Sequence, residues 1–75
     1  MNKKRRELIR QSVIYMEMGK NILKQVLNDE EMAFDNLSDG LQQTRRGDDM
    51  QENIDTLNDV VDAIDDIFDN LDNIL

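Results

Sequence analysis

The feature that most constrains this chain is the spacing of its large apolar residues from residue 50 to the end. They recur with alternating steps of four and three at Met50, Ile54, Leu57, Val61, Ile64, Phe68, Leu71 and Leu75. A pattern of this period, held over several heptads, predicts an α-helix that packs lengthwise against another helix. A further row at Val60, Ile67 and Ile74 widens the apolar stripe, which is typical of a helix in a bundle rather than in a bare two-stranded coiled coil.

The first half of the chain carries a second wide apolar stripe, which predicts a helix over residues 3–37. Its members recur at helical spacing at Leu8, Ile9, Val13, Tyr15, Met16, Ile22, Leu23, Val26, Leu27, Phe34 and Leu37. Small residues fall on the same face at Ser12, Gly19 and Ala33. A glycine inside a helix costs about 1 kcal/mol relative to alanine. We therefore expect another helix backbone to approach closely at Gly19, with a kink as the alternative.

Residues 37–46 predict a connection that contains one short helical turn, because this stretch combines Ser38, Asp39 and Gly40 with Gly47 just beyond it. Leu41 is its one large apolar residue, and we expect it to close the end of the core. A second helix over residues 47–75 would match the first in length. Two long helices with a short connection predict an all-α fold with one domain, residues 1–75, built as an antiparallel hairpin.

A lone hairpin would leave part of both wide stripes exposed, and the chain has few other ways to stabilise itself. It has 75 residues with no Cys and no His, which excludes disulfides and Cys/His metal sites. Association is the remaining stabiliser of so small a scaffold. We predict a homodimer that forms a four-helix bundle, although larger oligomers would also bury the stripes. The predicted interface residues are Ile9, Val13, Met16, Gly19, Leu23, Val60, Ile67 and Ile74.

The net charge of −8 is unevenly distributed along the chain. Residues 1–28 carry seven Lys and Arg against two acids, whereas residues 47–75 carry ten acids and no Lys or Arg. The acidic face of the second helix is a candidate site for a partner protein with a basic surface, through Asp55, Asp59, Asp62, Asp66 and Asp69. It could act by imitating a nucleic-acid backbone. The plainer alternatives are that the basic start of the first helix pairs with this face, or that water solvates it. The negative net charge argues against nucleic-acid binding.

Little in the sequence supports chemistry. No Ser or Thr stands beside an evident base, and the aspartates follow a helical pattern rather than a calcium-binding loop, so we expect no enzyme activity, no cofactor and no metal. Arg45 and Arg46 are candidates for contact with an anion such as a phosphate or a cyclic nucleotide, but they could equally pair with Asp39, Asp48 or Asp49. No apolar run approaches the roughly 20 residues of a membrane span, and no secretory signal is evident, so we expect a cytoplasmic protein.

The connection resembles that of a group of small uncharacterised acidic helical-hairpin proteins from phages and prophages of Gram-positive bacteria. The resemblance rests on Asn36-Leu37-Ser38-Asp39, Leu41-Gln42 and Arg46-Gly47-Asp48. The chain departs from that group in having Ser38 where proline is usual. The resemblance implies a mobile-element setting, in which small acidic proteins often inhibit host defence or DNA-processing enzymes. The leading hypothesis is therefore binding and inhibition of a host protein in the host cytoplasm. The alternatives are a self-assembling structural oligomer and a nucleotide-sequestering bundle.

Overall fold

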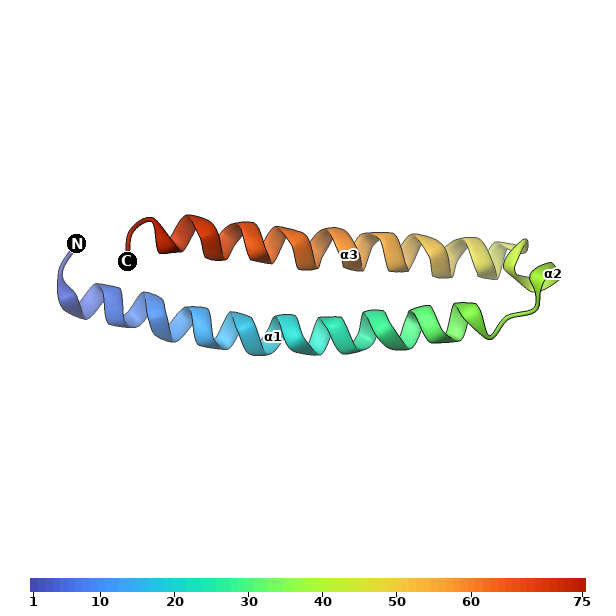
Figure 1. The fold of residues 1–75 in the computed structure, drawn as a ribbon, viewed down its shortest axis with the longest axis horizontal. Coiled ribbons are helices and arrows are strands. Elements are labelled where there is room, and N and C mark those ends of the chain that lie inside the picture. Colours follow the sequence, from blue (N-terminus) through green and yellow to red (C-terminus); the bar gives the residue numbers. More distant parts are fainter.

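The computed structural model describes residues 1–75 and contains three helices: α1 (Lys3–Asp35), α2 (Asp39–Gln42) and α3 (Arg45–Asp72). The long helices α1 and α3 lie antiparallel and side by side, so that both chain ends are at one end of the molecule and α2 is at the other (Figure 1). The molecule measures 58 × 16 × 12 Å. The predicted antiparallel hairpin is confirmed. The first helix ends two residues earlier than expected, and the second begins two residues earlier and ends three residues earlier.

Short polar side chains begin the first two helices. The Asn2 side-chain oxygen accepts a hydrogen bond of 2.9 Å from the backbone N–H of Arg5, at the start of α1. Ser38 plays the same part for α2, where its hydroxyl accepts from the backbone N–H of Leu41. These bonds satisfy N–H groups that have no partner within the helix. The chain therefore defines both helix starts locally, before any tertiary contact is made.

The hairpin turn is held by the side chain of Gln42. Its amide nitrogen donates to the backbone carbonyls of Phe34 and Leu37, at 3.2 and 3.3 Å, and so satisfies carbonyls at and just beyond the C-terminal end of α1. Leu41 does not close the end of the core as expected, because 52% of it is exposed. The bonds of Gln42 orient α2 so that Leu41 faces outward.

Gly47 allows the turn to pack against α3. A Cβ atom at this position would lie 2.7 Å from the carbonyl carbon of Gln42 and 2.8 Å from its Cα, closer than real Cβ atoms approach backbone. Gly47 is one of only three buried residues in the chain, with Met50 and Ile54. A glycine that reads as a helix breaker in the sequence is therefore a packing residue inside α3.

The contact between the two long helices is a single seam. Its residues are the buried and half-buried ones, apart from Gln42 in the turn, and they alternate by steps of three and four. On the α1 side they are Arg6, Ile9, Val13, Met16, Lys20, Leu23, Leu27, Glu30, Phe34 and Leu37. On the α3 side they are Gly47, Met50, Ile54, Leu57, Val61, Ile64, Phe68, Leu71 and Leu75. Because only Met50 and Ile54 are buried apolar residues, the hairpin has a line of contact but no closed core.

Three charged residues lie within this seam: Arg6, Lys20 and Glu30. Lys20 forms an ion pair with Asp65 of α3, and its ammonium group lies 5.7 Å from the centre of the Phe68 ring. The hydrogen bond to Asp65 raises the pKa of Lys20 above its ordinary value of 10.5. The Nε atom of Arg6 is buried without a hydrogen-bond partner. The register of α1 against α3 thus brings Lys20 to Asp65.

Neither long helix contains a stretch that is both long enough and apolar enough to cross a membrane.

Candidate functional site

The two sides of the hairpin differ in chemistry, and the seam separates them. One side is formed by the residues that directly follow seam residues, and we call it the polar side. On α1 these are Glu7, Arg10, Ile14, Glu17, Asn21, Lys24, Asn28, Glu31 and Asp35. On α3 they are Asp48, Gln51, Asp55, Asn58, Asp62, Asp65, Asp69 and Asp72. Ile14 is the single apolar residue among them, so this side is suited to face water.

The other side is formed by the residues that directly precede seam residues, and most of them are apolar or small. From this set we define the open apolar side as Leu8, Ser12, Tyr15, Gly19, Ile22, Val26, Ala33, Thr56, Val60, Ala63, Ile67, Asn70 and Ile74; the remaining members, Arg5, Asp29, Asn36, Arg46, Asp49 and Asn53, are polar or charged and, apart from Arg5, lie toward the hairpin turn. Every one of these residues is exposed in the hairpin. The exposed fraction of its large apolar residues ranges from 39% for Val60 to 64% for Tyr15. A row of exposed apolar side chains running along both helices usually marks an interface.

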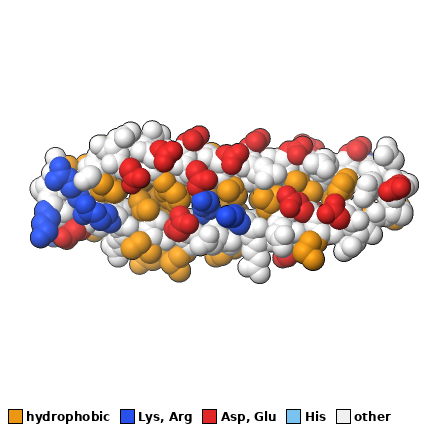
Figure 2. All heavy atoms as spheres, in the orientation of Figure 1, with side chains coloured by type: hydrophobic (Ala, Val, Ile, Leu, Met, Phe, Trp, Pro, Cys, Tyr) orange, Lys and Arg blue, Asp and Glu red, His pale blue; other side chains and the backbone are white.

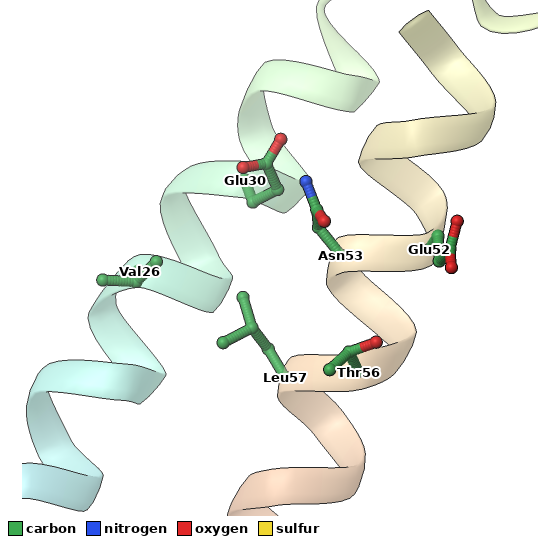
Figure 3. A pocket seen from close by; sticks show the side chains of 6 residues that line it. All are labelled: Val26, Glu30, Glu52, Asn53, Thr56 and Leu57. Atoms are coloured by element: carbon green, nitrogen blue, oxygen red, sulfur yellow. The ribbon is translucent and has the colours of Figure 1, made fainter. Parts of the chain in front are cut away.

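A shallow groove shows directly that these rows share one side of the molecule. Its volume is about 380 Å³, and it is lined by Val26 and Glu30 of α1 and by Glu52, Asn53, Thr56 and Leu57 of α3 (Figure 3). Val26, Asn53 and Thr56 each directly precede a seam residue, yet they come from both helices. The groove therefore lies on this side of the hairpin, toward the turn, and most of its lining residues are polar.

The structure divides the predicted interface residues into two groups. Ile9, Val13, Met16 and Leu23 lie in the seam, where packing against α3 already engages them. The other four are exposed on the open apolar side: Gly19, Val60, Ile67 and Ile74.

Gly19 has open space around it in the hairpin. A Cβ atom there would meet nothing within 4 Å, so no helix of the same chain makes the close approach that we expected. Helix α1 also runs through this position without a break, from Lys3 to Asp35. Within one chain, then, neither close packing nor an interruption of the helix accounts for Gly19.

The five aspartates of the predicted acidic face are all exposed on α3: Asp55, Asp59, Asp62, Asp66 and Asp69. We call these five residues the acidic surface. None of them forms an ion pair, and Asp55 accepts a hydrogen bond of 3.0 Å from the side chain of Gln51 on the same helix. On the face that Figure 2 shows, acidic side chains follow α3 along its length, whereas the visible basic side chains gather at the start of α1 and near the middle of the molecule.

The expected pairing of the basic first helix with the acidic second helix is therefore limited to one contact. Lys20 with Asp65 is the only ion pair in the structure, and Asp65 is not one of the five aspartates of the acidic surface. The charge of that surface is left without a direct partner in the chain.

Arg45 and Arg46 are the first two residues of α3, and both are exposed. They form no ion pair with Asp39, Asp48 or Asp49. Thr44, which precedes them, makes no side-chain hydrogen bond to the helix and donates its hydroxyl to the carbonyl of Leu41. The two guanidinium groups are thus available to an anion. They lie at the N-terminal end of α3, which is the positive end of the helix dipole.

Sequence reasoning missed the charged seam residues and the packing role of Gly47. The steps of three and four run from Arg6 to Leu37 only if Arg6, Lys20 and Glu30 are counted with the apolar residues. The signal was present as gaps in the apolar pattern at these three positions. Gly47 lies three residues before Met50 and so continues the steps of three and four on α3, whereas Gly19 and Gly40 do not fall on seam positions; this spacing was the signal for Gly47.

The fold and these surfaces define the protein as an open α-helical hairpin with one apolar side and one acidic surface. No group of three or more acidic side chains is arranged to hold a metal ion. Comparison of the chain with protein-family models, with curated proteins and with solved structures found no match.

Proposed function

We propose that this protein is a non-enzymatic interaction module that self-associates through its open apolar side and binds a host protein with a basic surface through its acidic surface. In this proposal it acts as an inhibitor of that host protein, as a phage or mobile-element accessory. The observation that carries the proposal is the separation of the two surfaces. The seam joins α1 to α3, the open apolar side lies on one flank of the seam, and the acidic surface lies elsewhere on α3, so all three can be occupied together.

Self-association is supported by the small extent of the core. Two buried apolar residues are too few to stabilise an independent domain, and scaffolds of this size generally need a partner, a disulfide or a metal. Covering the open apolar side would remove from water side chains that are 39–64% exposed in the hairpin. A dimer that forms a four-helix bundle is the simplest assembly that does this.

Partner binding is supported by the charge of α3. Aspartate is a poor helix former, and acidic residues near the C-terminal end of a helix oppose its dipole. Because none of the five aspartates of the acidic surface is neutralised within the chain, their cost to the helix has no compensation in the hairpin itself. A single-sign surface of this kind attracts an oppositely charged partner and raises the rate of association.

The test compares charge reversal on the two helices. The first variant carries Asp59→Lys, Asp62→Lys and Asp66→Lys on α3. The control variant carries Glu7→Lys, Glu17→Lys and Glu31→Lys on α1, which changes the net charge by the same amount at residues that are also exposed. Each variant is first checked by circular dichroism and sedimentation equilibrium.

Each folded variant is then used with the wild type to capture proteins from a host lysate. We expect a protein that the wild type and the α1 control retain and that the α3 variant loses, while all three keep the same oligomeric state. Equal capture by all three proteins would refute a role for the acidic surface.

The open apolar side also favours a second candidate function, a self-assembling structural oligomer with no heterologous target. This protein would form the same homo-oligomer at low and high salt, because the interface is apolar. It would capture no host protein through α3. Sedimentation equilibrium at both salt concentrations, together with the capture experiment, separates the two functions.

A further inference from the structure

We infer that the second copy covers the open apolar side in one orientation, with α1 of each copy beside α3 of the other and both hairpin turns at the same end of the bundle. The two-fold axis then runs along the bundle. In the alternative orientation, the two-fold axis runs across the bundle. Helix α1 of one copy then lies beside α1 of the other, α3 lies beside α3 of the other, and the two turns are at opposite ends. The inference rests on the self-association proposed above and adds its geometry.

The first argument is the size of the side chains in the outermost row of the open apolar side. On α1 this row holds the large residues Leu8, Tyr15 and Ile22, and it continues toward the turn with Asp29 and Asn36. On α3 the corresponding row holds Asp49, Thr56, Ala63 and Asn70, which are small or short. In a bundle of two hairpins, these outer rows meet across the interface.

The register of the seam matches large residues with small ones. Lys20 contacts Asp65, and the helices run antiparallel, so Ile22 is level with Ala63 and Tyr15 is level with Asn70. When the two-fold axis runs along the bundle, levels are the same in both copies. Ile22 then faces Ala63 of the second copy, and Tyr15 faces Asn70.

The alternative orientation packs this interface unevenly. It sets the large row of α1 against itself and the small row of α3 against itself, which crowds one edge of the interface and leaves a gap at the other. Both overpacking and cavities reduce stability, whereas large residues opposite small ones interdigitate.

The second argument is charge. Helix α1 carries seven Lys and Arg and six acids, whereas α3 carries two Arg and ten acids. Placing α3 beside α3 would bring together two helices that each carry a net charge of −8. Placing α3 beside α1 of the other copy gives each acidic helix a neighbour with a net charge of +1. Like-charge repulsion between adjacent helices therefore disfavours the same orientation that packs unevenly.

The test measures the distance between the same residue in the two copies. The chain has no cysteine, so a single Gln43→Cys or Asn73→Cys substitution places one spin label at the turn or near the C-terminus, at exposed positions. We expect dipolar spectroscopy to give label-to-label distances at both positions that are shorter than half of the 58 Å long axis. Distances that approach the length of the molecule would refute the orientation and leave the dimer intact. A monomer by sedimentation equilibrium would refute the proposed self-association as well.

A second measurement tests the match of large and small residues. Ala63→Ile should weaken the dimer about tenfold or more, because the new side chain meets Ile22 of the other copy. Combining it with Ile22→Ala should recover part of the affinity. If α3 lay beside α3, Ala63→Ile would instead fill a gap and tighten the dimer, so a stronger dimer would overturn the inference.

Discussion

Ile22 and Ile14 offer a matched pair of positions for testing the open apolar side. Both are isoleucines in α1, and their exposed fractions are 63% and 60%, so the two side chains are almost equally exposed to water in a single hairpin. They differ only in position: Ile22 directly precedes the seam residue Leu23 and lies on the open apolar side, whereas Ile14 directly follows Val13 and lies on the polar side. We predict that Ile22→Gln weakens the dimer and that Ile14→Gln does not.

The size of the effect follows from the exposed fraction. Fully burying an isoleucine side chain contributes about 1.5–3 kcal/mol. In the hairpin 63% of Ile22 is still exposed, so its burial by a second copy contributes about 1–2 kcal/mol per copy. A dimer contains two such residues, and their loss should cost about 2–4 kcal/mol, which raises the dissociation constant roughly 30- to 700-fold. Gln is a good helix former, so the helix itself should be little affected.

Sedimentation equilibrium over a concentration range measures both dissociation constants, and circular dichroism at the same concentrations checks that the helices are intact. The wild type serves as the reference. If the two variants changed the dissociation constant equally, or if Ile14→Gln had the larger effect, the second copy would not sit on the open apolar side and the reasoning would be wrong.

Three further predictions concern the hairpin itself, each measured by urea or thermal unfolding. Gly47→Ala should lower the unfolding free energy by about 1–3 kcal/mol, because its Cβ would overlap the turn backbone, whereas Gly40→Ala has open space and should raise it by about 0.5–1 kcal/mol. If the two substitutions had the same sign, the close approach at Gly47 would be refuted. The raised pKa of Lys20 means that its ion pair contributes stability below pH 10.5, which is lost as the pH rises through the folded-state pKa. Lys20→Met should lack this alkaline loss, and an unchanged pH profile in the variant would contradict the assignment. Glu30→Leu should add apolar burial to the seam and stabilise by about 1 kcal/mol, whereas Glu31→Leu, at an exposed position, should change little; equal effects would show that Glu30 is not a seam residue.

The hairpin could be predicted from the sequence because its information is local and periodic. The regular steps from Met50 to Leu75 and the breaker residues of the connection specify two long helices and a turn, and the short connection leaves only an antiparallel arrangement. The acidic surface was equally predictable, because aspartates spaced at helical intervals opposite an apolar stripe must face outward.

The division of the wide stripes into a seam and an open apolar side was not predictable in the same way. An apolar stripe indicates which part of a helix avoids water, but it does not indicate which row of the stripe meets the other helix of the same chain. The pattern alone assigned Ile9, Val13 and Leu23 to the interface between copies, whereas packing with α3 draws them into the seam.

What the sequence by itself determined is the set of properties that depend on one helix at a time: two amphipathic helices, their caps, their turn and the charge of each. What only the tertiary structure decided is the register between the helices. That register brings Lys20 to Asp65 and leaves Ile22, Val60 and Ile67 uncovered on the same flank. The physical reason is that the observed register is the one with the lowest total free energy of all the contacts between α1 and α3. Residues distant in the chain determine it jointly, so no local sequence pattern predicts it.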